Sequence, residues 1–283
     1  MRQAADYVAA AIVAATPLGG GFGPVAHFHN VMPRSIALPS AHNPTPFTDY
    51  LIAQCGPKWE HFTRHAFPFA LARGDVDRRS FLHFIVQDYH YLVHYARTNA
   101  LAAYKSDTIE DMAASSVIVN TVANEVKMHL AFCERFGISK EQVLATQESI
   151  VNTAYNRFVL DSASKGDLLD LRVVTAPCLI GYGHAGAWLC SQPDGIVDRS
   201  EESNPFWRWI SEYGGEGFQG AVRTGIELLE RTVAERPIAG KRLEDVTRLF
   251  VRATELEIAF WDEAIAAAAA ATTVDAAAVP AKS

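Results

Sequence analysis

The sequence predicts an all-α protein, and three observations carry this prediction. Residues 77–104 place apolar and aromatic side chains at i, i+3, i+4 and i+7, the repeat of one buried helix face. Helix-capping residues stand between stretches of this kind: Asp77 before the first, and the pair Ser139 and Gln142 before a later one. No alternating strand pattern of useful length appears. We therefore expect a bundle of about eight helices.

The N-terminal part differs in composition from the rest. Residues 4–15 are rich in alanine and predict a short helix, whereas residues 16–44 hold many glycines and prolines and predict an extended linker. A signal peptide is disfavoured because Asp6 interrupts the start and the apolar run that follows is short. No stretch approaches the roughly 18 apolar residues of a membrane span, so we expect no membrane association.

From Pro46 onward the pattern is helical almost throughout. Gly137 is expected to end the second long helix, since glycine is favoured just past a helix C-terminus. Residues 270–283 begin with alanines and are low in complexity, and we interpret them as a disordered tail. The expected helices cover 77–104, 109–136, a short segment after Ser139, 147–163, 167–191, 205–212, 216–234 and 240–269.

Composition limits the possible partners. The chain has 283 residues, of which 49% are hydrophobic and 20% charged, as in ordinary globular proteins. Its net charge of -7 and the lack of a basic stripe argue against nucleic acid as a partner. The four cysteines contain no CxxC pair and suit a reducing compartment, so we expect a cytoplasmic protein.

Three helix faces that should be apolar carry reactive side chains: Asp88, Cys178 and Glu257. Burying a charged group is unfavourable unless it is paired or used. A thiol and two carboxylates therefore indicate a pocket with a nucleophile and acid/base partners. Pro177 adds a helix irregularity beside the thiol. Simpler readings stay open: Cys178 as a small apolar side chain, Asp88 as a cap or arginine partner, and Glu257 in a buried ion pair.

Other patterns are weaker. The cluster Gly19–Pro24 follows no strand and completes no phosphate-loop motif, so linker is the better interpretation. His27 and His29 lack further metal ligands. Glu125 and His129, four residues apart, suggest a carboxylate–histidine metal centre, but matching ExxH pairs are missing. We expect no metal.

Over about residues 46–266 the sequence resembles the TenA/thiaminase II family of aminopyrimidine hydrolases. Five motifs in the family's order carry the resemblance. They are Gln87-Asp88-Tyr89-His90-Tyr91-Leu92 preceded by Phe81, Thr153-Ala154-Tyr155, Pro177-Cys178 with Tyr182, Trp209 with Tyr213, and Glu257 with Phe260-Trp261.

The resemblance implies a heme-oxygenase-like helical bundle, a homotetramer, and no metal or organic cofactor. It implies hydrolysis of an aminomethylpyrimidine, or of thiamin, to release hydroxymethylpyrimidine. Cys178 would be the nucleophile and Glu257 the acid/base at a ring nitrogen, while Asp88 would hold the ring amino group and the thiol. The residues that would stack on the pyrimidine or bond to it are Tyr91, Tyr155, Tyr182 and Tyr213.

Two departures accompany the resemblance. The family often has an acidic residue shortly after the Tyr182 position, where this chain has His184. Residues 1–34 instead resemble the last helix and the tail of a hydroxymethylpyrimidine phosphate kinase. We interpret 1–45 as a kinase-like remnant and linker, from a truncated fusion or an imprecise gene model, and expect no kinase activity. The helical domain would then span 46–269.

Two other functions stay open from the sequence. One is a catalytically reduced pyrimidine-binding or regulatory protein on the same fold. The other is a helical metal oxidase. The sequence also leaves open whether thiamin or a degraded aminopyrimidine is the substrate, because both present the same ring.

Overall fold

The computed structural model describes residues 37–277. The expected helix at 4–15, the glycine-rich cluster, both candidate histidines and the kinase-like segment 1–34 lie outside this range. All regular structure within it is helical, which confirms the all-α prediction. The helices are α2 (Pro46–Cys55), α3 (Pro57–Thr63), α4 (Ala66–Arg73), α5 (Arg78–Lys105), α6 (Ile109–Arg135), α7 (Lys140–Ala145), α8 (Ile150–Lys165), α9 (Leu168–Cys190), α10 (Trp207–Gly214), α11 (Glu216–Glu235) and α12 (Gly240–Ala277).

The capping residues act where the sequence predicts. The Asp77 side chain accepts a hydrogen bond from the backbone of Arg79 at the start of α5. Ser139 and Gln142 form a reciprocal capping box at the start of α7. Gly137 follows the end of α6 with a φ of 83°, a conformation that glycine adopts without steric cost.

Two expectations about the helices need correction. The described residues contain more helices than the eight expected, partly because the chain between Pro46 and Arg73 forms three short ones. Gly56, with a φ of 54°, separates the first two of these. The disordered tail was also placed too early, since α12 continues to Ala277. Alanine has the highest helix propensity, so the run after residue 265 prolongs the helix.

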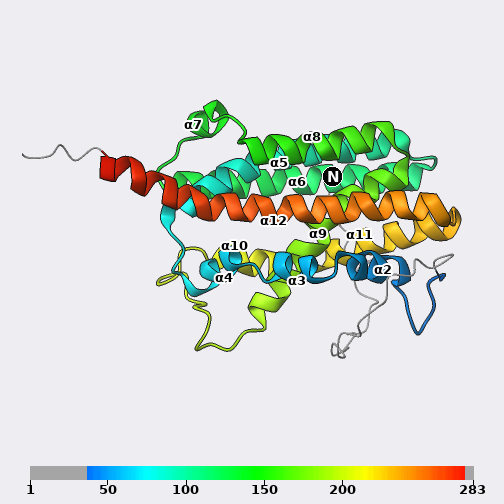
Figure 1. Cartoon of the computed structure of the whole chain (residues 1–283), viewed down its shortest axis with the longest axis horizontal. Helices are drawn as coiled ribbons and strands as arrows, with labels where there is room; N and C mark the ends of the chain where they lie inside the picture. The colour runs from blue at the N-terminus through cyan, green and yellow to red at the C-terminus, as the bar shows by residue number, and fades with distance from the viewer. Residues whose placement is uncertain (1–36, 278–283) are drawn as a thin grey trace, which may run out of the picture. The chain divides into compact units, whose positions relative to one another are not determined.

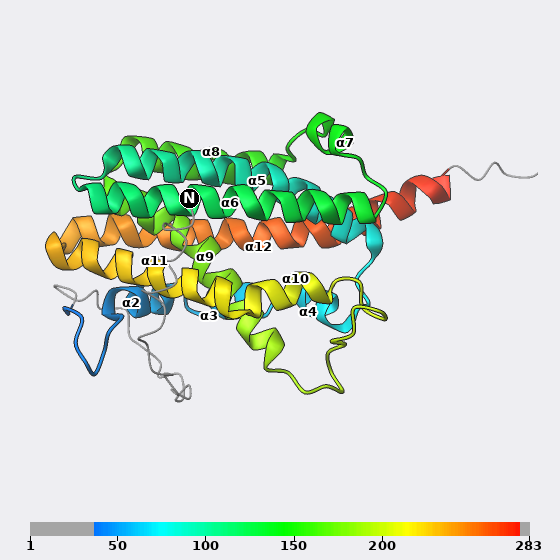
Figure 2. The ribbon, with the colours of Figure 1, turned by 180° about the vertical axis from the view of Figure 1, so that it is seen from behind.

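The helices form two groups on either side of α12 (Figures 1 and 2). Helices α5, α6 and α8 lie on one side, and α2, α3, α4 and α10 on the other. Helix α9 packs on α12, α10, α11 and α8, and also contacts α5 and α3. It is therefore the central helix, and residues on its different faces can meet side chains from both groups.

Helix α9 is also long and apolar enough to cross a membrane, which corrects the expectation that no stretch approaches this length. Within the described chain it alone meets both conditions, and 67% of the stretch is buried inside the bundle. The central helix of a globular bundle has the same length and composition, so this one finding is weak support for a membrane span.

Gly186 on α9 allows a close approach that shapes the site. A Cβ atom there would lie 2.5 Å from the backbone carbonyl carbon of Tyr213, so any other residue would push α10 away. The close contact places the Tyr213 ring beside that of Tyr182, with 5.3 Å between ring centroids.

A buried carboxylate joins α11 to the first turn of α2. Glu230 accepts hydrogen bonds from the backbone N–H groups of Phe47 (3.2 Å) and Thr48 (2.7 Å), and from the Thr48 hydroxyl (2.7 Å). Glu230→Ala leaves these buried donors unpaired and is expected to lower the free energy of unfolding by about 3 kcal/mol in urea titration. The exposed Glu227 on the same helix supplies the control, since Glu227→Ala should change it by less than about 0.5 kcal/mol. Equal effects of the two would contradict this role.

Candidate active site

A thiol, a carboxyl group and two phenols from four helices form one buried cluster. Tyr155 (α8) donates to Glu257 Oε1 (α12) at 2.6 Å. Tyr91 (α5) donates to the Tyr155 hydroxyl at 3.3 Å, and their rings stack with 4.9 Å between centroids. The Cys178 thiol (α9) lies near Tyr91 and Glu257, since both act on its pKa. The structure thus brings the candidate nucleophile close to the candidate acid.

Glu257 is a buried acid, only 1% exposed. Burial raises its pKa to about 8, although the hydrogen bond from Tyr155 opposes the rise. At neutral pH the carboxyl group is therefore mostly protonated and can donate a proton. Its hydrogen-bond partner Tyr155 is not basic, and neither is the nearby Cys178, so the contacts shown do not support the ion-pair reading.

Cys178 rests as a neutral thiol. Burial raises its pKa well above the ordinary value, and the negative charge of Glu257 adds to the rise, while the hydrogen bond with Tyr91 opposes it. Part of the side-chain surface is still accessible. We attribute the high pKa to the buried groups around the sulfur. They stabilise a thiolate less well than water does, even though part of the Cys178 surface is accessible.

Asp88 has a partner that the sequence analysis did not assign to it. Its Oδ2 lies 2.7 Å from Nε2 of His129 (α6), in place of the expected arginine or helix cap. In the described part of the chain, no hydrogen bond joins Asp88 to the thiol that it was expected to hold, and the Asp88 carboxylate raises the pKa of Cys178 through its charge.

Glu125 extends this second network to α10. Its carboxylate accepts a hydrogen bond from the Tyr213 hydroxyl at 2.7 Å, and its backbone oxygen lies 3.0 Å from Nδ1 of His129. Burial raises the pKa of Glu125. Burial disfavours the charged form of His129, but the hydrogen bond and charge of Asp88 outweigh this, and the pKa of His129 is raised.

The remaining candidate residues line the same space. The Tyr182 hydroxyl accepts a hydrogen bond from Trp261 Nε1 at 3.1 Å. The charges of Glu257 and Asp88 both help to raise the pKa of Tyr182, after burial, so its phenol lies close to both acids. The His184 side chain makes a different contact, because its Nδ1 accepts a hydrogen bond from Trp59 at 3.3 Å. Burial lowers the pKa of His184.

The sequence singled out Glu125 and His129 only as possible metal ligands. The structure shows them bonded to Tyr213 and Asp88 instead. Within residues 37–277, no three His, Cys, Asp or Glu side chains group closely enough to hold a metal ion. Their spacing of four residues puts both side chains on one face of a helix, beside buried acids. This spacing was the signal that could have identified them as part of the site.

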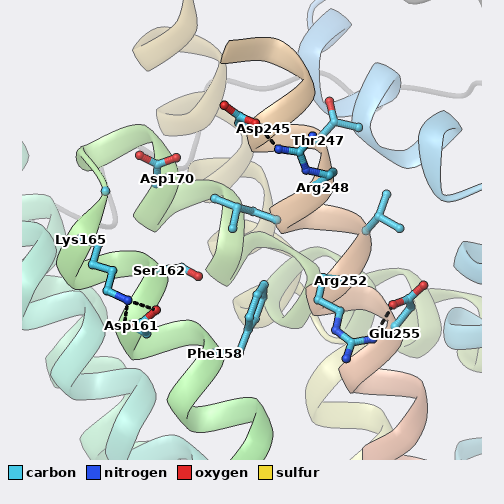
Figure 3. A pocket seen from close by; sticks show the side chains of 13 residues that line it. Phe158, Asp161, Ser162, Lys165, Asp170, Asp245, Thr247, Arg248, Arg252 and Glu255 are labelled. Carbon is cyan, nitrogen blue, oxygen red and sulfur yellow. Dashed lines mark hydrogen bonds and ion pairs between the residues drawn. The ribbon is translucent and has the colours of Figure 1, made fainter. Parts of the chain in front are cut away.

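A groove lies elsewhere in the protein, between α8 and α12 (Figure 3). Its volume is about 780 Å³. Its basic residues are paired with acidic neighbours: Lys165 with Asp161, and Arg252 with Glu255 at 2.9 Å. None of the candidate catalytic residues lines it. We therefore place the chemistry in the buried cluster and not in this groove.

Comparison with known proteins identifies the family of this chain. The profile of the TENA/THI-4/PQQC family matches residues 52–267, which is most of the chain and contains every residue of the cluster. The chain belongs to this family. Its kinase-like N-terminal segment precedes the family's match.

Relatives of the family share this part of the sequence. The chain is 32% identical over 213 residues to an uncharacterized protein of Haemophilus influenzae, covering 75% of this chain and 96% of that one. It is 30% identical over 220 residues to the aminopyrimidine aminohydrolase of Halalkalibacterium halodurans, covering 77% and 95%.

A fused relative bears on the N-terminal segment. A putative hydroxymethylpyrimidine/phosphomethylpyrimidine kinase of Schizosaccharomyces pombe is 31% identical over 259 residues, covering 91% of this chain and 45% of that protein. An alignment of this length is longer than the chain after residue 45, so it includes part of the kinase-like segment. The chain thus spans under half the length of this relative.

Solved structures show the family's fold. A TenA family transcription regulator of Silicibacter sp. has a TM-score of 0.71 at 36% identity, over 77% of this chain and 96% of that one. A Shewanella denitrificans domain described as having a heme oxygenase-like fold has a TM-score of 0.59 at 14% identity, over 77% and 91%. The heme-oxygenase-like fold expected from the resemblance is confirmed.

Deleting residues 1–34 is expected to leave turnover and the thermal midpoint unchanged. The family's match begins at residue 52, and the residues of the cluster all follow it. Calorimetry and an assay of pyrimidine release, on the full and shortened chains side by side, would check this. A clear fall in either quantity would show that the N-terminal segment supports the bundle.

Proposed function

We propose that the protein is a thiamin-salvage hydrolase that releases 4-amino-5-hydroxymethyl-2-methylpyrimidine from an aminomethylpyrimidine or from thiamin. One observation carries the proposal: Cys178 and the buried acid Glu257 lie close together inside a cluster of tyrosines. A family that includes proteins named aminopyrimidine aminohydrolase supports it. A homotetramer and a cytoplasmic location belong to the same proposal and rest on the family resemblance and the cysteine content.

The first step uses the contact between the two groups. Glu257 is protonated at neutral pH and gives its proton to a ring nitrogen of the pyrimidine, which makes the ring electrophilic. The sulfur of Cys178 then adds to a ring carbon. The thiol proton passes to the Glu257 carboxylate, which lies near the thiol. A neutral thiol thus becomes a nucleophile without first forming a free thiolate.

The second step breaks the bond to the leaving group. The electron pair of the adduct's ring expels the substituent from the exocyclic methylene, and a departing amine takes up the proton of the ring nitrogen through Glu257. Water then adds to the methylene, and its proton returns to the ring nitrogen. Cleavage of the sulfur–carbon bond restores the aromatic ring, and the proton taken from the ring nitrogen returns to the sulfur through Glu257.

Asp88 and the tyrosines bind the ring in this proposal. Asp88 accepts a hydrogen bond from the ring amino group. Tyr91 and Tyr155, stacked on each other in this structure, move apart or present one face to the pyrimidine. Tyr182 and Tyr213 close the other side of the site.

The alternative is a pyrimidine-binding or regulatory protein with reduced catalysis. The strongly raised pKa of Cys178 favours it, and a solved relative at 36% identity is described as a transcription regulator.

Chromatography of reactions containing thiamin and 4-amino-5-aminomethyl-2-methylpyrimidine as competing substrates separates the two functions. Release of the hydroxymethylpyrimidine from either compound supports the hydrolase and identifies the preferred substrate. Binding of the product pyrimidine without turnover of either compound supports the alternative. Absence of both binding and turnover would contradict both.

A further inference from the structure

The contacts of His129 fix how many protons it shares with Asp88. Nδ1 lies 3.0 Å from the backbone oxygen of Glu125, an atom that can only accept, so Nδ1 carries a proton. Nε2 lies 2.7 Å from Asp88 Oδ2. One proton must lie between these two atoms, because two lone pairs would otherwise face each other. The pair is therefore either imidazolium and carboxylate, or imidazole and carboxylic acid.

The surroundings favour the imidazolium and the carboxylate. His129 is fully buried and Asp88 is 3% exposed, so the pair is shielded from solvent. The charges of Asp88 and Glu125 both favour a proton on His129. Asp88 thereby keeps its negative charge, and a charged acceptor forms stronger hydrogen bonds than a neutral one.

Asp88 can use that charge toward the site. Only its Oδ2 is bonded to His129, and Oδ1 has no hydrogen-bond partner among residues 37–277. Its charge acts on the groups at the centre of the cluster, raising the pKa of Cys178, Glu257 and Tyr182. The carboxylate is thus held at one oxygen, and its charge acts on the reactive groups.

We propose that His129 is a positioning residue that holds Asp88 as an oriented carboxylate, so that Oδ1 selects pyrimidines carrying a 4-amino group. This inference rests on the proposed pyrimidine site. It assigns selectivity to a residue on α6 that would not itself touch the ligand. A hydrogen bond to a charged acceptor should favour the amino compound over its des-amino analogue by about tenfold or more.

Two amide substitutions separate the roles of the two ring nitrogens of His129. The amide of His129→Asn stands near the position of Nδ1 and can still donate to the Glu125 carbonyl, but it does not reach Asp88. The amide of His129→Gln extends toward the position of Nε2 and can still donate to Asp88. Both introduce the same chemical group at the same buried position, so each is the control for the other. Circular dichroism and thermal melts verify that both are folded.

Titration calorimetry with 4-amino-5-hydroxymethyl-2-methylpyrimidine and with 5-hydroxymethyl-2-methylpyrimidine measures the preference. We expect the full-length wild type and His129→Gln to prefer the amino compound at least about tenfold, and His129→Asn to bind both within about threefold. His94→Asn is a further control, because His94 forms a part-buried pair with Glu148 at 2.8 Å and makes no hydrogen bond to Asp88, so its loss should not change the preference.

The possible results are distinguishable. If the wild type prefers the amino compound and His129→Asn keeps that preference, the inference fails while the proposed function stands. An equal loss of preference in both amide variants would also overturn it, since that indicates a general packing role. If the wild type binds neither pyrimidine, the proposed function fails and this inference with it.

Discussion

A Cys178→Ser variant is expected to retain less than about a tenth of the wild-type turnover, a loss of at least about 1.4 kcal/mol in transition-state stabilisation. The site already raises the pKa of the thiol, and an alcohol in the same surroundings gives up its proton far less readily. Oxygen is also the poorer nucleophile toward a protonated ring. Steady-state assays with the aminomethylpyrimidine would measure the loss.

The fold should survive this exchange, because serine is close to cysteine in size. Cys190 on the same helix offers a control that lies outside the cluster, and Cys190→Ser should keep turnover within about twofold, as expected for a site outside the chemistry. Turnover above a tenth in the Cys178 variant would mean that sulfur is not the nucleophile. In that case the thiol would serve only to fill the space beside Glu257.

Glu257→Gln is expected to lower turnover by about 10²–10⁴-fold, the usual contribution of a general acid/base group. The amide oxygen can still accept the hydrogen bond from Tyr155, so binding of the pyrimidine should persist. The amide cannot supply a titrating proton. The control is Glu255→Gln, which alters a carboxylate that pairs with Lys58 and Arg252 at the protein surface, two residues away.

The same substitution should change how stability depends on pH. The pKa of Glu257 is raised from 4.5 to about 8 on folding, so in the wild type its stabilising effect is complete below pH 4.5 and is lost as the pH rises toward 8. The glutamine side chain does not titrate, so the variant does not lose stability in this way as the pH rises. Its thermal midpoint should therefore equal or exceed that of the wild type at neutral pH, with a difference that grows from pH 5 to pH 8. A variant with near-normal turnover and a sharply lower midpoint would instead indicate a structural role for Glu257.

Much of the fold could be predicted because long helices repeat their apolar positions. Helix α5 shows this repeat over 28 residues, and Asp77 caps it as expected. The region from Pro46 to Arg73 could not be divided in the same way. Each of its three helices has ten residues or fewer, too short for the periodicity to mark a boundary.

The site was predictable in part for a related reason. Asp88, Cys178 and Glu257 each replace an apolar residue on a buried face, and buried faces of neighbouring helices meet. The bond between Asp88 and His129 joins residues 41 positions apart on different helices, which no local pattern records. The local pattern around His129, with Glu125 four residues before it, pointed to a metal instead.

The neutral state of Cys178 has a consequence for how the protein ages in the cell. Peroxides and alkylating agents attack the thiolate, and the raised pKa of Cys178 leaves very little of it at neutral pH. In the proposed mechanism the sulfur becomes reactive only when a proton can move through Glu257 to a bound ring. We therefore expect oxidative stress to inactivate the protein more slowly than an enzyme that stores its cysteine as a thiolate.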